Sequence, residues 1–94
     1  MDRTAGRDVY VMKVRIYAQR NTGLEELGAI VLKDGQLISE PKIPALNVLL
    51  SEPLIIRGKT TRLLIDPENQ PKMFLEALPL CVRGSYFWAG KVEE

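Results

Sequence analysis

The segment from Val9 to Gln19 restricts the fold of this chain more than any other feature, because its side chains show a clear alternation along the sequence. Alternation with a period of two places successive side chains on opposite faces of a β-strand, whereas a helix needs a period of about 3.6. The two predicted faces comprise Tyr10, Met12, Val14, Ile16 and Ala18 on one side, and Val9, Val11, Lys13, Arg15 and Tyr17 on the other. The segment therefore predicts a strand with one buried face.

Two turn signals predict that this strand belongs to an antiparallel sheet. The sequence Arg20-Asn21-Thr22-Gly23 collects turn-forming residues, and its glycine is free to adopt positive φ. Asp34-Gly35 lies between the apolar run Leu27 to Leu32 and a second short apolar run, which is a strong hairpin signal. We expect the chain to reverse at both places, because tight turns join neighbouring antiparallel strands.

Proline positions and apolar periodicity predict two short helices. The first begins at Pro44 and ends before Pro53, and its apolar face comprises Ile43, Leu46, Leu49 and Leu50. The second runs from about Pro71 to Leu78, since proline is tolerated in a first helical turn. Its apolar face comprises Phe74, Leu75 and Leu78, continued by Cys81 and Val82 after a break or kink at Pro79, and Gly84 ends it.

The aromatic segment from Ser85 to Val92 predicts a final strand with two apolar faces. These faces comprise Tyr86, Trp88 and Val92 on one side, and Phe87 and Ala89 on the other. We expect a central position in the sheet, because both faces of such a strand need cover. The short runs Leu54 to Arg57 and Arg62 to Ile65 suit either strands or a loop, and their pattern does not choose between the two.

These elements predict an α+β fold, with a small antiparallel or mixed sheet of three to five strands and two short helices packed on one face. The 94 residues fit one domain. We expect residues 1–8 to form a disordered N-terminal tail, since they are polar and lack apolar periodicity. Residues 9–94 are expected to form the single α+β domain.

Charge and cysteine content restrict the compartment and the partners. The 13 Lys and Arg residues against 12 Asp and Glu give a net charge of +1, so no overall field attracts a polyanion. A single cysteine, Cys81, cannot form an internal disulfide, which favours the cytoplasm. The apolar stretch near the start is interrupted by Lys13 and Arg15, so we expect no signal peptide and no contact with a membrane.

The absence of histidine removes the commonest general base and the commonest metal ligand. With one cysteine besides, we predict no catalytic residue, no metal site and no bound cofactor. Glu25 and Glu26 are adjacent, and Asp66 and Glu68 flank a turn, but we interpret these acids as solvated strand-edge and helix-start residues. An enzyme that uses carboxylates, Arg, Lys or Tyr is our third hypothesis.

Two further segments imitate reactive motifs. Gly58-Lys59-Thr60 resembles the end of a phosphate-binding loop, but Pro53 occupies the position of the required first glycine and no long helix follows. We interpret this segment as a turn. Cys81 lies in an apolar segment with Arg83 as its only neighbouring cation, which favours a buried structural thiol over a reactive one.

The outer face of the predicted sheet carries the residues that we expect to contact a partner, namely Lys13, Arg15, Tyr17, Tyr86 and Trp88. With Val9 and Val11, this face would form an apolar patch larger than a monomer usually exposes. Our leading hypothesis is a small non-enzymatic protein-interaction module. Its partner is an unknown protein or a second copy of the chain in a homodimer.

A nucleic-acid-binding module is the alternative hypothesis. Its predicted surface joins cations of the first strand and of the 54–65 segment to aromatic stacking platforms: Lys13, Arg15, Arg20, Arg57, Lys59 and Arg62, with Tyr17, Tyr86 and Trp88. We rank it second because the net charge is only +1 and because the aromatic side chains can instead fill the core or a dimer interface.

Two segments resemble parts of short bacterial proteins of uncharacterised function. The sequence Phe74-Leu75-Glu76-Ala77-Leu78-Pro79, followed by Arg83-Gly84-Ser85-Tyr86-Phe87 and Ala89, is similar to their ending. The segment from Leu27 to Gly35 is similar to their earlier half. The resemblance covers about half of the chain and implies a self-contained domain, and it carries no activity, cofactor or functional residue.

Overall fold

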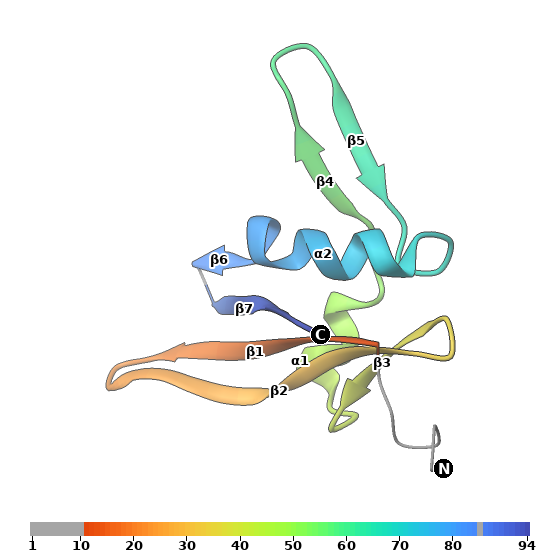
Figure 1. Cartoon of the computed structure of the whole chain (residues 1–94). Coiled ribbons are helices and arrows are strands. Elements are labelled where there is room, and N and C mark those ends of the chain that lie inside the picture. Colours follow the sequence, from red (N-terminus) through yellow and green to blue (C-terminus); the bar gives the residue numbers. More distant parts are fainter. Residues whose placement is uncertain (1–10, 85) are drawn as a thin grey trace.

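The computed structural model describes residues 11–84 and 86–94, which form a five-stranded sheet, a separate two-stranded sheet and two helices (Figure 1). The elements are β1 (Met12–Arg20), β2 (Gly23–Lys33), β3 (Gln36–Glu40), α1 (Pro44–Leu49), β4 (Leu54–Arg57), β5 (Arg62–Ile65), α2 (Pro71–Cys81), β6 (Arg83–Gly84) and β7 (Phe87–Glu93). The large sheet has the order β3-β2-β1-β7-β6, and its pairings are antiparallel. The predicted tail, residues 1–8, and the predicted start of the last strand, Ser85, lie outside the described residues.

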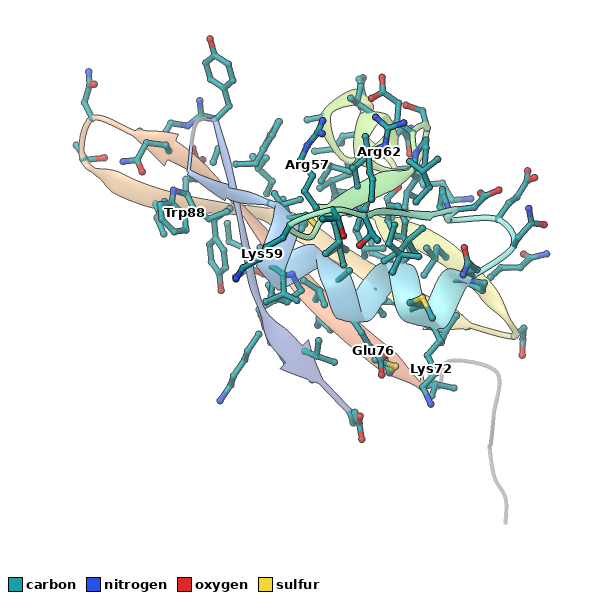
Figure 2. The ribbon with its side chains drawn as sticks, turned by 90° about the horizontal axis from the view of Figure 1, so that it is seen from above. Arg57, Lys59, Arg62, Lys72, Glu76 and Trp88 are labelled. Carbon is teal, nitrogen blue, oxygen red and sulfur yellow. The ribbon has the colours of Figure 1, made fainter. Side chains whose placement is uncertain are left out.

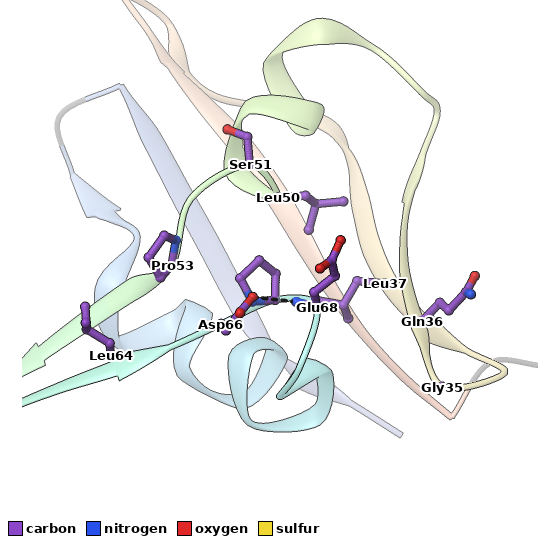
Figure 3. A pocket seen from close by; sticks show the side chains of 10 residues that line it. Gly35, Gln36, Leu37, Leu50, Ser51, Pro53, Leu64, Asp66 and Glu68 are labelled. Carbon is purple, nitrogen blue, oxygen red and sulfur yellow. Dashed lines mark hydrogen bonds between the residues drawn. The ribbon is translucent and has the colours of Figure 1, made fainter.

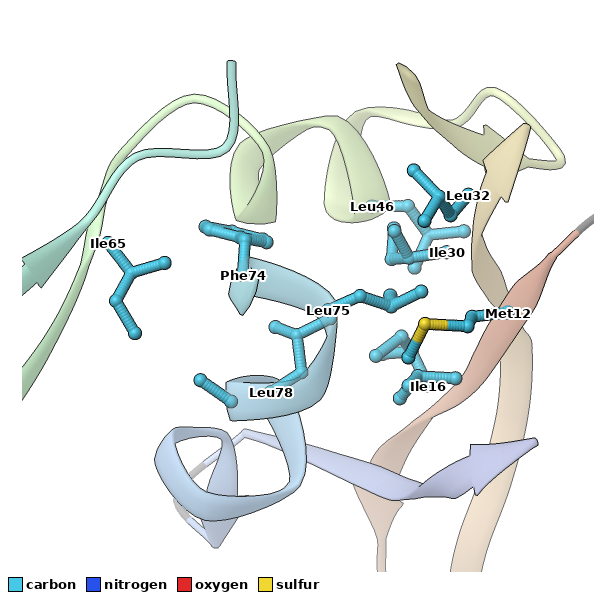
Figure 4. Close-up of a cluster of buried hydrophobic side chains, with 11 residues drawn as sticks. Met12, Ile16, Ile30, Leu32, Leu46, Ile65, Phe74, Leu75 and Leu78 are labelled. Atoms are coloured by element: carbon cyan, nitrogen blue, oxygen red, sulfur yellow. The ribbon is translucent and has the colours of Figure 1, made fainter. Parts of the chain in front are cut away.

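Both helices pack on one face of the large sheet, which confirms the predicted α+β arrangement (Figure 4). Fully buried side chains from the sheet and from both helices form one cluster, whose largest members are Phe74, Met12, Ile16, Ile30, Leu46, Ile65, Leu75 and Leu78. Each such side chain contributes roughly 1.5–3 kcal/mol by its removal from water. This cluster is therefore the main source of stability.

Strand β1 has the alternation that the sequence predicts. Its buried side chains face the helices, and its half-buried ones face outward: Met12, Val14, Ile16 and Ala18 inside, and Lys13, Arg15 and Tyr17 outside. The first predicted reversal is also confirmed, because Arg20 opposes Gly23 across a tight turn. At the second, Asp34 and Gly35 both have positive φ, of 53° and 76°, which is the geometry of a hairpin turn matched to strand twist.

A β-bulge in β2 brings this strand very close to the end of β3 and to α1. Gly28 opposes Ile16, and the register then shifts so that Leu27 is an extra residue. Gly28 has a φ of 152°, and a Cβ at this position would overlap the backbone carbonyl oxygen of Glu40 at the end of β3. It would also lie 2.7 Å from Pro41 Cδ and 2.9 Å from Leu46 Cδ1. Both the backbone conformation and the space therefore require glycine here.

Helix α1 begins at Pro44 as predicted, and Leu46 is its fully buried residue. The other residues of its predicted apolar face pack against the core while remaining partly exposed: Ile43, Leu49 and Leu50. A polar contact also ties the helix to the sheet, since the buried Ser39 Oγ on β3 donates to Asn47 Oδ1 at 2.8 Å. This contact satisfies the one buried polar side chain identified among the described residues.

Helix α2 continues past the end that the sequence predicts. It runs to Cys81 and includes Pro79. A proline inside a helix removes one backbone hydrogen bond, but here the N–H of Val82 still donates to the carbonyl oxygen of Leu78 at 2.8 Å and closes the last turn. The prediction that Gly84 ends this helix is wrong, because that residue belongs to β6.

Strand β7 lies between β1 and β6, as predicted for a central strand, although β6 covers only its first residues. The predicted faces of β7 are partly wrong. Val14 opposes Val92 whereas Ile16 opposes Ala89, so β7 contains one extra residue between these pairs. This irregularity turns Val92 toward the core and away from the face of Trp88.

The segment that the sequence leaves open, residues 54–65, is a hairpin that we call the arm. Strands β4 and β5 pair with each other and project beyond α2, which lies between the arm and the large sheet (Figure 1). Leu54, Ile56 and Ile65 attach the base of the arm to the core. The N–H of Gly58 donates to the carbonyl oxygen of Thr61 at 2.8 Å and closes the loop, which confirms that Gly58-Lys59-Thr60 forms a turn.

Candidate interaction surfaces

The outer face of the large sheet gathers four of the five residues predicted to contact a partner. Lys13, Arg15 and Tyr17 alternate with the buried residues of β1, and Trp88 on β7 lies directly opposite Tyr17. Tyr86 is 79% exposed in the turn that precedes β7, at the end of the sheet. The structure thus brings Lys13, Arg15, Tyr17 and Trp88 onto one face and leaves Tyr86 at its margin.

Carboxylates neutralise two of the cations near this face. Arg15 Nε donates to Glu93 Oε2 at 2.9 Å, and Arg15 Nη1 donates to Glu26 Oε2 at 3.2 Å. The hydrogen bond and the charge of Glu93, followed by the charge of Glu26, raise the pKa of Arg15 above its ordinary value. Arg20 Nε is paired in the same way with Glu25 Oε1 at 2.7 Å. Both guanidinium groups already have anionic partners, which weakens their attraction for phosphate.

The aromatic side chains of the outer face are half-buried and engaged within the sheet. Tyr17 and Trp88 form a cross-strand pair, and Trp88 Nε1 donates to Gln19 Oε1 at 3.3 Å. Val11 is 59% exposed beside β1, whereas Val9, which the predicted apolar patch includes, lies outside the described residues. Among the described residues, this face does not present the broad exposed apolar patch that the sequence predicts.

Three exposed aliphatic residues lie close together on the arm, whereas Leu24, Val48 and Leu80 are on other elements. Ile55, Leu63 and Leu64 are 41%, 49% and 52% exposed. Ile55 lies directly opposite Leu64, so these two side chains form one row on the face that turns away from Leu54 and Ile56. A two-stranded hairpin is marginally stable by itself in water, and this hairpin has cover on one face only. Its other face is therefore a candidate docking surface.

A sequence signal for the arm exists. The run Leu-Ile-Ile-Arg before the loop is mirrored by Arg-Leu-Leu-Ile after it, as expected for two strands that face each other across a turn. No acidic residue lies between positions 54 and 65, whereas acids flank the segment at Glu52, Asp66 and Glu68. The mirrored apolar runs predict the hairpin, and the charge distribution distinguishes its tip from its base.

The tip of the arm carries three cations. Arg57 lies directly opposite Arg62 and extends from the same side of the arm, and Lys59 lies in the loop (Figure 2). Within residues 11–84 and 86–94, no ion pair involves these three side chains. Like charges directly opposite each other destabilise a strand pair. The tip is therefore suited to an anionic partner.

A groove lies at the base of the arm, between the β2–β3 turn, the end of α1 and the loop that leads from β5 into α2 (Figure 3). Its volume is about 820 Å³, and Leu64 from the arm lines it together with Asp66 and Glu68. Asp66 is held in place, because its Oδ1 accepts the N–H of Glu68 at 2.9 Å and its Oδ2 accepts Asn69 Nδ2 at 2.7 Å. These bonds place both acids in the turn before α2, so the helix-start interpretation is wrong: the first turn of α2 contains no acidic residue. The two acids give the groove a negative charge.

The nucleic-acid surface predicted from the sequence is divided in space. Lys13, Arg15 and Arg20 belong to β1 of the large sheet, whereas Arg57, Lys59 and Arg62 lie on the arm. The sheet and α2 separate these two groups (Figure 1). The six predicted cations therefore do not form one continuous patch, and the prediction that joined them is wrong.

The single thiol is in an unreactive setting. Cys81 is half-buried, and its Sγ lies 4.0 Å from the carbonyl oxygen of Ile55 on the arm. Burial raises the pKa of this thiol, which reduces the thiolate population at neutral pH and supports the predicted structural role. In the part of the chain that the structure describes, no group of three His, Cys, Asp or Glu side chains is placed to hold a metal ion.

Comparison with known proteins yields no match to a family model, to a curated protein or to a solved structure. Among the described residues, no helix combines the length and the apolar character needed to cross a membrane. The resemblance to short bacterial proteins thus stays a prediction. A proposal for the function therefore depends on the outer face of the sheet, the arm and the groove.

Proposed function

We propose that this chain is a non-enzymatic protein-interaction module and that its docking surface is the exposed face of the arm. The observation that carries the proposal is the row formed by Ile55 and Leu64 on a projecting hairpin. Removal of this apolar surface from water would contribute about 25 cal/mol per Å² to association. The outer face of the sheet is the weaker candidate, because Arg15 and Trp88 already have partners there.

The free, half-buried Cys81 supports a reducing compartment, and we propose that the module acts in the cytoplasm. Such a setting keeps the thiol reduced beside the arm, where it contacts Ile55. Recovery of the native protein from the soluble cytoplasmic fraction, with Cys81 open to a thiol reagent after denaturation, is the expected result. A Cys81 thiol already oxidised in the isolated protein would contradict this location.

Affinity capture with the Leu64→Thr variant tests the docking surface. Threonine retains the preference for strands while removing most of the apolar side chain. We expect recovery of a specific protein partner from nuclease-treated native lysate to fall about fivefold or more, as loss of about 1 kcal/mol of apolar burial implies. Leu24→Thr is the matched control, because Leu24 is also 52% exposed in a strand but lies on another hairpin. Equal recovery with both variants would contradict the proposal.

The cations of the arm support a second candidate, a nucleic-acid-binding module. Arg57, Lys59 and Arg62 lie together at the tip of the arm, where they can contact the phosphates of a single strand. We rank this candidate second because residues 54–65 include no aromatic side chain on which a base could stack.

The salt dependence of binding distinguishes the second candidate from the first. Three phosphate contacts predict that the logarithm of the affinity for single-stranded RNA falls with the logarithm of salt concentration with a slope of about −2. Arg57→Gln is expected to reduce that slope by about 0.7, whereas Arg15→Gln, on the outer face, leaves it unchanged. A slope near zero would eliminate this candidate.

A further inference from the structure

We infer that the partner of the arm is a second copy of this chain, whose arm packs against the first in the antiparallel direction around a two-fold axis. The inference rests on the proposed function of the arm and names its partner. It follows from the distribution of apolar and charged residues along one face of the arm, which is self-complementary only in that direction.

The exposed face of the arm has two rows of residues and a continuation into the groove. Ile55 and Leu64 form the first row, and Arg57 and Arg62 form the second row toward the tip. Residues two apart on a strand share a face and lie about 6.6–6.8 Å apart, so the two rows are separated by about that distance. On the base side, Asp66 lines the same groove as Leu64. The face therefore reads acidic, apolar, basic from base to tip.

A two-fold axis through the apolar row brings complementary groups together. Ile55 and Leu64 of one copy then meet Ile55 and Leu64 of the other, and the tip of each arm reaches the base of its partner. In such an isologous contact every interaction occurs twice. Arg57 and Arg62 repel each other within one arm. In the dimer, each such pair would lie near the Asp66 carboxylate of the other copy. A parallel arrangement would instead place cations against cations and acids against acids.

The groove at the base gives the partner's tip a place to bind. Its volume of about 820 Å³ accommodates long side chains, and its walls include Leu37 and Leu50. Arginine can lay its aliphatic stem along apolar walls of this kind while its guanidinium group reaches a carboxylate. Asp66 and Glu68 supply that carboxylate charge, and Glu52 adds a third acid to the base of the arm. Shape and charge thus agree in this groove.

Nucleic acid fits the same face less well than a second copy does. Phosphates would contact Arg57 and Arg62 at the tip, but the acidic groove would repel the remainder of the polyanion. Ile55 and Leu64, 41% and 52% exposed, would also remain in water. The arm is short, so the paired faces would bury less than about 1,200 Å² in total, which is the range of weak complexes. We expect a dissociation constant in the micromolar range or weaker.

A charge-swap experiment tests both the partner and the direction of packing. The tip variant is Arg57→Glu with Arg62→Glu, and the base variant is Glu52→Lys with Glu68→Lys. Asp66 is left unchanged, because both of its carboxylate oxygens hold the turn. Each variant alone has like charges at both tip–base contacts of a homodimer. A mixture of the two variants restores opposite charges at both contacts of a heterodimer.

Sedimentation velocity over a concentration series supplies the measurement, with Lys91→Glu as the control for a change of charge elsewhere on an exposed residue. We expect the wild type and the control to dimerise, each charge-swap variant to dimerise at least tenfold more weakly, and the equimolar mixture to recover wild-type association. Circular dichroism checks that every variant is folded. A mixture that stays monomeric would overturn the antiparallel packing, and dimerisation that neither variant weakens would overturn the role of the arm.

A wild-type protein that is monomeric at all concentrations would overturn the inference outright. Affinity capture with the Leu64→Thr variant then decides whether the proposed function also fails. If that variant still loses a protein partner in affinity capture, the arm binds a different protein and the proposed function stands. If Leu64→Thr and wild type recover the same proteins, both the inference and the proposed function fail. Salt-sensitive RNA binding by the monomer would favour the second candidate instead.

Discussion

Replacing Gly28 with alanine should cost a large part of the stability of this domain. A non-glycine residue at a φ of 152° is strained by about 1–3 kcal/mol. The added Cβ would also lie 2.9 Å from Leu46 Cδ1 and 2.7 Å from Pro41 Cδ, closer than real contacts allow, and such overpacking costs about 1–3 kcal/mol. Together these effects predict that the free energy of unfolding falls by roughly 2–6 kcal/mol, against a total of about 5–14 kcal/mol for a domain of this size.

Urea denaturation followed by the fluorescence of the single tryptophan, Trp88, measures this loss. With a slope of about 1.5 kcal/mol per molar urea, the midpoint should fall by about 1–4 M. Gly23→Ala is the matched control, because Gly23 also has positive φ, 126°, but no atom lies within 4 Å of its Cβ position. Gly23→Ala should show the backbone strain without the overpacking. Equal midpoints for the two variants would refute the conclusion that β2 packs closely against the end of β3 and against α1 at Gly28.

Two further predictions concern the contacts that hold the helices. In a double-mutant cycle of Ser39→Ala and Asn47→Ala, the coupling free energy should be about 0.5–1.5 kcal/mol, because Ser39 Oγ donates to Asn47 Oδ1 from a buried position. A coupling near zero would show that this bond does not stabilise the fold. The Cys81 thiol should react with iodoacetamide more slowly than free cysteine near neutral pH and should accelerate as the pH approaches its raised pKa. Reaction as fast as free cysteine would contradict its burial beside the arm.

The elements predicted correctly from the sequence are those whose signal is local. The alternation of β1 and the Asp34-Gly35 turn depend on neighbouring residues only, so the strand, its buried face and the hairpin follow directly. The prolines at the starts of α1 and α2 act in the same local way. These signals were sufficient for the fold class and for the face on which the helices pack.

The features that the sequence did not reveal depend on pairing between distant segments. The extra residue in β7 is defined by its pairing with β1. The sequence of β7 alone therefore could not predict that Val92 faces the core. Arg15 meets Glu93 only because the ends of the chain pair in one sheet, and this pair neutralises a cation expected to face a partner. The arm had a usable signal in its mirrored apolar runs, but its direction away from the sheet depends on α2.

A dilution series monitored by ¹H–¹⁵N correlation spectra most directly tests whether the arm binds a second copy of the chain. The chain is 10.6 kDa, so the backbone amides can be followed individually from high to low concentration. Dimerisation through the arm predicts concentration-dependent shifts at Ile55, Arg57, Arg62, Leu64 and Asp66, with the outer face of the sheet unchanged. Shifts confined instead to the strands that carry Lys13, Arg15, Tyr17 and Trp88, or no shifts at any amide, would contradict it.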